Sequence, residues 1–345
     1  MEEVKNPAGR YRVQFAVLGV LLVVVVLGSI CMGRFPVEVG EVVQIIGARL
    51  GLAAWDGLDP AATTAVLEVR LPRILVCAGV GAALSVAGAA YQGVFQNPMV
   101  SQDVMGASSG AAFGAALAIL LALGAKGVTL SAFLFGVLAV AISYSVSRVS
   151  RSNPILALIL AGMVVSALFS SGTSTIKLVA DTEEALPAIT YWLMGSMASI
   201  REGDVLPTLA LILAGVLPVF LLRWRINILA TGEDEARSLG MNTNAMRLAV
   251  IGCATFLTAV CVSVSGLIGW VGLVIPHFCR MMFGHDYRRV IPASLLMGAS
   301  FLVVVDDLAR MLVTSEIPIG ILTSFVGAPI FIWLIAKGGG SRGRS

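Results

Sequence analysis

The chain has 345 residues, of which 58% are hydrophobic and only 12% are charged, and its mean hydropathy is +0.94. In an ordinary soluble domain roughly a quarter of the residues are charged, so this composition excludes a soluble enzyme and indicates a single membrane domain over residues 1–345. The net charge is only +3, and the five cysteines lie in apolar runs without CxxC spacing. That pattern argues against a disulfide framework or a thiolate metal site and predicts that the cysteines are packing residues.

Apolar windows long enough to cross a bilayer follow one another along the chain. A helix needs about 20 apolar residues to cross about 30 Å of hydrocarbon. Eight windows lie between charged side chains: 13–33, 74–102, 104–125, 127–147, 152–176, 205–222, 248–279 and 317–336. The window 248–279 is long enough for two passes joined at its glycines, and 290–309 adds another. The sequence therefore predicts an all-α protein with ten transmembrane helices, the first being an anchor and not a signal peptide.

Two segments between these windows are predicted not to span. Residues 34–72 form an outer loop with an amphipathic helix around Val39–Leu50, and the uncharged run Ala185–Ile200 forms a surface or re-entrant helix between passes five and six. SVAG at 85–88 is similar to SVSG at 263–266, and MGAS at 105–108 recurs at 297–300. These similarities predict two inverted repeats, about 70–175 and 247–337, of the kind that builds a midplane pathway in transporters. Chance similarity in a chain rich in glycine, alanine and serine is the alternative.

The basic residues set the predicted orientation, because cytoplasmic loops carry an excess of lysine and arginine. An even number of passes puts both termini on one side. With that side cytoplasmic, fifteen of the 23 basic residues lie inside and eight outside. The sequence thus predicts a multi-pass protein of the cell (inner) membrane with both termini in the cytoplasm.

Signals of enzyme chemistry are nearly absent from the sequence. It contains no GxxxxGK[ST] phosphate-binding loop, no HExxH and no histidine pair on one helical face. Asp306 and Asp307 are adjacent, so on a helix they point about 100° apart and cannot form a facing protease dyad. An ion-coupled carrier, the alternative from a different class, needs ionisable groups in the middle of a window, and none is present there. We therefore predict a transport protein that is not itself an enzyme and binds neither metal nor cofactor.

The loop 226–246, between passes six and seven, carries the most ordered polar pattern in the chain. In ILATGEDEARSLGMN (228–242), Thr231 followed by Asp234 is similar to a capping box, and Gly240 suits a helix end. The acidic residues suit the positive helix N-terminus. We predict an amphipathic helix of about two turns with Ala236 and Leu239 facing inward. It is either a solvated linker or a helix that docks into a groove on another protein.

Three long motifs occur in this order: RLPRILVCAGVGAALSVAGAAYQGVFQNPMVSQDVMGASSGAAFG (70–114), GEDEARSLGMN (232–242) and GLIGWVGLVIPHFCRMMFGHDYRRVIPASLLMGASFLVVVDDLARMLVTSEIPIGILTSFVGAPIFIWLI (266–335). With them the chain resembles, from about 14 to 337, the permease subunits of ABC importers for ferric siderophores, haem and vitamin B12. The resemblance implies a type II ABC importer permease that forms a homodimer. It also implies two cytoplasmic ATPase subunits that hold ATP and magnesium, and a soluble or lipid-anchored binding protein, with no nucleic-acid partner.

The same resemblance implies the substrate class, an iron(III)-siderophore complex. Haem, vitamin B12 and an oxyanion such as molybdate remain open, because specificity in the family lies chiefly in the binding protein. The resemblance also assigns the loop 232–242 to ATPase coupling. The implied coupling residues are Gly232, Glu233, Asp234, Glu235, Ala236, Arg237, Leu239 and Gly240.

Two further sets of residues take their roles from the resemblance. The implied translocation pathway and gate consists of Asn97, Pro98, Met99, Gly81, Ala82 and Gly88. An ordinary helix terminus is the alternative for the Asn-Pro pair, and close helix packing is the alternative for the small residues. The arginines implied to dock the binding protein are Arg70, Arg73 and Arg310. Pairing with Glu68, Asp306 or lipid headgroups is the alternative for them.

Overall fold

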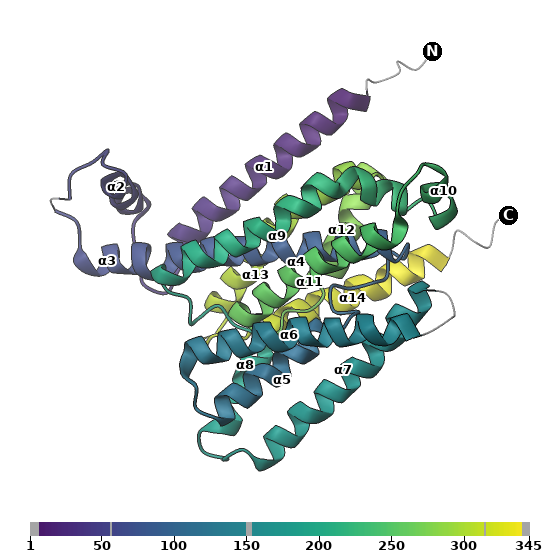
Figure 1. Ribbon diagram of the computed structural model, residues 1–345. Helices are drawn as coiled ribbons and strands as arrows, with labels where there is room; N and C mark the ends of the chain where they lie inside the picture. The colour runs from purple at the N-terminus through teal and green to yellow at the C-terminus, as the bar shows by residue number, and fades with distance from the viewer. Residues whose placement is uncertain (1–6, 56, 150–153, 314, 340–345) are drawn as a thin grey trace.

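The structure is a computed structural model that describes residues 7–55, 57–149, 154–313 and 315–339 (Figure 1). Over these ranges it consists of α-helices and one π-helical segment, η1, joined by mostly short connections. The elements are α1 (Pro7–Cys31), α2 (Val39–Arg49), α3 (Pro60–Thr64), η1 (Ala65–Arg70), α4 (Leu71–Val94), α5 (Ala107–Leu120), α6 (Gly124–Val149), α7 (Pro154–Val179), α8 (Ala185–Met194), α9 (Glu202–Leu229), α10 (Glu233–Ser238), α11 (Thr243–Ser265), α12 (Val271–Phe283), α13 (Tyr287–Met311) and α14 (Ile319–Gly339).

Seven of the described helical segments are long and apolar enough to cross a membrane. They are α1, the continuous run Pro60–Val94, α6, α7, α9, α11 and α13. The shorter apolar helices α5, α12 and α14 coincide with predicted passes three, eight and ten, and α8 is the short helix predicted between passes five and six. The structure confirms a multi-pass, all-helical membrane protein.

The predicted boundaries fail where the chain turns back on itself after α4. Windows 74–102 and 104–125 shrink to α4, which ends at Val94, and α5, whose 14 residues are only about 21 Å long. The twelve residues between them form an irregular segment, and windows bounded only by charged side chains include most of it because Asp103 is its one charged residue. By contrast, the window 248–279 divides between Ser265 and Val271, at the predicted glycines.

Helix α4 lies at the centre of the bundle, and nearly all of its residues are buried. It packs against α9, α11, α12 and α13, while α5, α6 and α7 pack on one another. Figure 1 shows α2 and α3 at one end of the bundle, and α10, the start of α1 and the end of α14 at the other. The bundle thus has two distinct ends, each with its own candidate site.

Candidate functional site

The loop between α9 and α11 folds into the predicted short helix, α10. Gly232 precedes it with a φ of 149° and Gly240 follows it with a φ of 78°, and both backbone conformations favour glycine. Ala236 is fully buried against the bundle, as predicted. The exposed side chains of α10 are Asp234, Glu235, Arg237 and Ser238. The helix therefore presents a charged face at this end of the molecule.

Glu233 ties α10 to the start of α11. One carboxylate oxygen accepts a hydrogen bond from Arg247 at 2.9 Å, and the other accepts one from Arg237 at 2.6 Å and one from Thr243 at 3.3 Å. Burial by itself would raise the pKa of the Glu233 carboxyl, but its hydrogen bond to Arg247 and the charges of Arg247 and Arg237 outweigh burial and lower it. The carboxylate is held in its charged form, and the position of α10 is fixed.

Two details of the sequence prediction for this loop are wrong. Thr231 does not cap α10: its hydroxyl donates to the carbonyl of Ile228 at 2.8 Å, closing the end of α9 instead. Leu239 does not face inward but is 70% exposed. The reason is that the chain leaves the helix at Ser238, so the helical periodicity that placed Leu239 on the inner face no longer applies.

The Asn-Pro turn lies at the same end of the bundle as α10. Asn97, Pro98 and Met99 are all exposed, and the Asn97 side chain accepts a hydrogen bond from the Met99 N–H at 2.9 Å. Gln96 reaches across to donate to the carbonyl of Leu229 at the end of α9, at 2.9 Å. The turn is thereby tied to the helix that leads into α10.

A buried polar cluster holds the irregular segment behind this turn in place. Gln92 on α4 donates to the carbonyls of Val100 at 3.0 Å and Gly272 at 3.3 Å, and it accepts a hydrogen bond from Arg280 on α12. Gln102 donates to a carbonyl just before α12, at 3.2 Å. The sequence analysis missed this cluster. The available signal was the presence of Gln92 and Gln102 in a window predicted to span the membrane.

The small residues of α4 lie at helix contacts. A Cβ added to Gly81 would collide with the carbonyl of Gly298 on α13, and one added to Gly88 would collide with Gly272 on α12. Ala82 is 7% exposed. Residues without bulk allow such close helix approach, so these contacts fit the alternative of close packing, and a pathway role for Gly81, Ala82 and Gly88 stays a prediction.

The predicted docking arginines are engaged within the chain at the α2 and α3 end. Arg73 donates to the Asp306 carboxylate at 2.8 to 3.1 Å and to Glu316 at 2.9 and 3.0 Å. Arg310 lies 3.2 Å from the same Asp306 and also contacts Asp307. Asp306 is only 1% exposed. These charges therefore neutralise one another in the interior, which is one of the alternatives weighed from the sequence.

Arg70 has a different environment. It donates to the carbonyls of Ile30, at 2.8 Å, and Phe35, and so satisfies backbone groups at the end of α1. Glu68, its predicted alternative partner, is exposed. Arg70, Arg73 and Arg310 are 4%, 5% and 8% exposed. Contact of these arginines with a binding protein stays a prediction.

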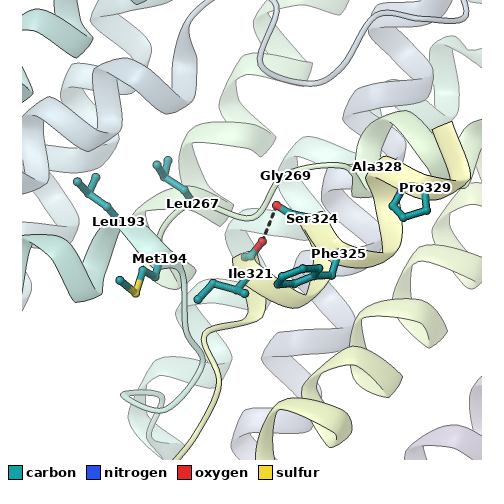
Figure 2. Close-up of a pocket in the computed structure, with 10 residues that line it drawn as sticks. Leu193, Met194, Leu267, Gly269, Ile321, Ser324, Phe325, Ala328 and Pro329 are labelled. Atoms are coloured by element: carbon teal, nitrogen blue, oxygen red, sulfur yellow. Dashed lines mark hydrogen bonds between the residues drawn. The ribbon is translucent and has the colours of Figure 1, made fainter. Parts of the chain in front are cut away.

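An apolar pocket between α8, α14 and the connection before α12 was not foreseen from the sequence. Its volume is about 690 Å³. Figure 2 shows Met194 and Leu267 on one side and Phe325 and Pro329 of α14 on the other, with Ser324 donating back to the carbonyl of Gly320 at 2.8 Å. Phe325 is 74% exposed. No local pattern predicts such a pocket, because three distant segments form it.

Helix α7 exposes a polar face that the sequence analysis also missed. The exposed hydroxyl side chains are Ser170, Ser171, Ser174 and Thr175. Ser174 and Thr175 each donate to the backbone one turn earlier at 3.0 Å, which leaves acceptor oxygens facing outward. Polar groups at membrane depth are tolerated where they face protein or a water-filled cavity. The spacing of these hydroxyls along one window was the available signal.

Residues 21–337 match the model of the FecCD transport family. The chain belongs to the FecCD transport family. It is 39% identical over 320 residues to a molybdate import system permease protein of Haemophilus influenzae, covering 93% of this chain and 94% of that protein.

Other relatives are named for other cargoes. A protein of Helicobacter pylori named "Probable iron chelatin transport system permease protein" is 40% identical over 272 residues, covering 79% of this chain and 82% of the relative. A hemin transport system permease of Yersinia pestis is 34% identical over 335 residues, covering 94% of this chain and 96% of the relative. This FecCD permease also superimposes on a solved inward-facing metal-chelate type ABC transporter with a TM-score of 0.84 and 38% identity, covering 94% and 98% of the two chains. The predicted family is confirmed.

Proposed function

We propose that two copies of this FecCD permease form the transmembrane part of an ATP-driven importer. Each copy crosses the membrane ten times, with α5, α12 and α14 added to the seven long segments, and both termini are cytoplasmic. The observation that carries this proposal is the position of α10. It lies at the same end of the bundle as the start of α1 and the end of α14, held there by Glu233 and Ala236 with its charged face exposed.

Force from ATP hydrolysis enters through α10. Two cytoplasmic ATPase subunits hold ATP and magnesium, and each receives one α10 in a groove. The exposed Asp234, Glu235 and Arg237 make the contact, with Leu239 as an apolar anchor beside them. Glu233 transmits movement to α11 through Arg247. This chain itself binds no cofactor.

A soluble or lipid-anchored binding protein docks at the opposite end, near α2 and α3. Because Arg70, Arg73 and Arg310 are buried there, we assign them the role of holding the outer ends of α1, α4 and α13 in position beneath the docking surface. This role replaces direct pairing with the partner's carboxylates.

The pathway lies between the two copies. The pocket beside α14 and the hydroxyl face of α7 line it, and Asn97 to Met99 form its cytoplasmic mouth. Met99 tests this arrangement. After replacement of the five native cysteines, Met99→Cys should form an oxidant-induced dimer whose yield depends on nucleotide. No crosslink in any nucleotide state would contradict an axial position.

An iron(III)-siderophore complex is the proposed cargo. The pocket lining is almost entirely apolar, and its one hydroxyl already donates to the backbone. Such a surface suits a bulky chelate with an organic exterior. A molybdate cargo is the second candidate, favoured by the 39% identical Haemophilus relative. It would require polar donors that this lining does not offer.

The test is uptake by proteoliposomes that contain the permease, its ATPase and its binding protein. We expect ATP-dependent accumulation of labelled ferric siderophore that excess molybdate does not reduce. Molybdate accumulation with no ferric siderophore uptake would select the second cargo. Uptake driven by a proton or sodium gradient without the ATPase would contradict the importer itself.

A further inference from the structure

A groove runs along α6 and α11 on a side of the bundle that the proposed pathway does not use. Phe133 and Phe256 meet edge to face, with ring centroids 5.8 Å apart, at one end of it. Tyr144 stands at the other end. The groove has a volume of about 510 Å³ and an almost entirely apolar lining. Eleven residues of helix separate Phe133 from Tyr144, about 16 Å, which is half of the roughly 30 Å hydrocarbon thickness of a bilayer.

Tyr144 also lines a second, small basic cavity of about 260 Å³. Among the residues that the structure describes, three arginines line it, Arg148 of α6, Arg237 of α10 and Arg247 of α11, and no acidic residue does. Glu233, just outside the lining, pairs with two of them. One carboxylate thus balances only part of the charge of three guanidinium groups, and the cavity keeps an excess of positive charge.

Two features show that the charge in this cavity is incompletely satisfied. Arg148 is exposed and has no ion pair among residues 7–55, 57–149, 154–313 and 315–339. Arg247 is only 3% exposed, yet its Nε has no hydrogen-bond partner in the described structure. Buried polar groups are normally paired. The cavity therefore lacks an acceptor.

We propose that this groove binds one anionic phospholipid of the cytoplasmic leaflet, with its phosphate at Arg148 and Arg247 and an acyl chain along α6 and α11. The length of the groove matches one leaflet, and the basic cavity lies at the end that carries α10. Tyr144 stands where the groove and the cavity meet, and tyrosine is enriched at the membrane–water interface. Basic pockets between membrane helices on the cytoplasmic side are suited to anionic headgroups.

The outer end of the same side has different chemistry. There the cavity beyond Phe133 is lined by Lys126 and Asp204, whose charges balance. An anionic headgroup would find no net positive charge in this outer cavity, so we place the binding site in the cytoplasmic leaflet alone. A lipid phosphate at Arg247 would also contact the residue that holds Glu233, and so bound lipid stabilises the position of α10.

Native mass spectrometry of the full-length permease in mild detergent tests the proposal. Dioleoyl phosphatidylglycerol and dioleoyl phosphatidylcholine are titrated separately. We expect one phosphatidylglycerol held per subunit in clear preference to phosphatidylcholine. Arg148→Gln should lower that affinity about fivefold, because one arginine near an anionic headgroup contributes about 1 kcal/mol. The matched control is Arg12→Gln, an exposed arginine of α1 without an ion pair in the described structure, which should leave binding unchanged.

A second pair of variants tests the acyl chain position. Gly252 lines the groove, and a Cβ there would meet no atom within 4 Å. Gly252→Leu should therefore fold normally and fill the groove, reducing phosphatidylglycerol binding, whereas Gly252→Ala should not. Equal retention of both lipids, or unchanged binding in both Arg148→Gln and Gly252→Leu, would overturn the proposal. So would loss of ATPase association in Arg148→Gln with phosphatidylglycerol binding intact, since that result assigns the cavity to the ATPase.

Discussion

Glu233 and Arg247 form an ion pair 2.9 Å long that joins the first residue of α10 to the first turns of α11. The arginine is buried, with a side-chain exposure of 4%, and the glutamate is 22% exposed. The pair is thus the firmest polar link between the predicted coupling helix and a membrane-crossing helix.

Loss of this link should loosen α10 without unfolding the bundle. Glu233→Gln leaves the buried Arg247 without its charge partner, and we expect a cost of about 1–3 kcal/mol. Hydrogen exchange of the amides from Gly232 to Met241 should become faster. Asp234→Asn, which removes an exposed carboxylate, is the control and should leave exchange unchanged. Equal exchange in both variants would mean that the ion pair does not hold the helix.

The same pair should tolerate mild acid. The pKa of Glu233 in the folded chain lies below its ordinary value of about 4.3. Its contribution to stability is therefore fully present above that ordinary value and is lost as the pH falls through the lower folded value. Exchange rates in the α10 region, corrected for the intrinsic effect of pH, should stay constant from pH 8 to 5. A loosening already at pH 6 would contradict a lowered pKa.

Charge reversal on the exposed face of α10 should separate the permease from its ATPase. Asp234→Lys combined with Glu235→Lys alters neither the Glu233 anchor nor the buried Ala236. Membrane insertion should remain normal while the ATPase no longer co-purifies, and transport should be lost. A complex that forms and transports at the wild-type rate would remove α10 from the ATPase interface.

Substitution of Gly88 should reveal a packing role. A Cβ at this position collides with the backbone of Gly272, so one helix must shift. Overpacking of this kind costs about 1–3 kcal/mol, and we expect Gly88→Ala to lower the thermal midpoint of the purified protein. Gly252→Ala is the matched control, because its Cβ meets nothing. Altered transport with an unchanged thermal midpoint would instead favour the original pathway assignment.

Removal of Arg73 should destabilise the end of the bundle that carries α2 and α3 (Figure 1). Arg73→Gln leaves Asp306 buried with only Arg310 beside it, and breaking a buried pair costs about 3–5 kcal/mol. Asp306→Asn in the same chain should restore part of the thermal stability. If Arg73→Gln left stability unchanged and only weakened the binding protein's affinity, the direct docking role predicted from the sequence would be correct.

The sequence by itself determined the features that depend on local pattern. Hydropathy located the membrane helices, but its windows missed the first turns of α1 and the last turns of α9 and continued past Val94 into an irregular segment. Gly240 marked the end of α10, because a positive φ can be anticipated from residue type, whereas the start predicted at Thr231 was wrong. The long motifs alone indicated the family.

Only the tertiary structure decided what each side chain touches. Arg73 pairs with Asp306, which lies 233 residues away in the sequence. Gly88 of α4 contacts Gly272 of α12, and the hydropathy of these two helices does not indicate that they are neighbours. The groove along α6 and its basic cavity likewise need residues of α6, α7, α10 and α11. Helix formation depends on neighbours a few residues apart, whereas packing depends on contacts between distant segments, and one sequence contains no local signal for those contacts.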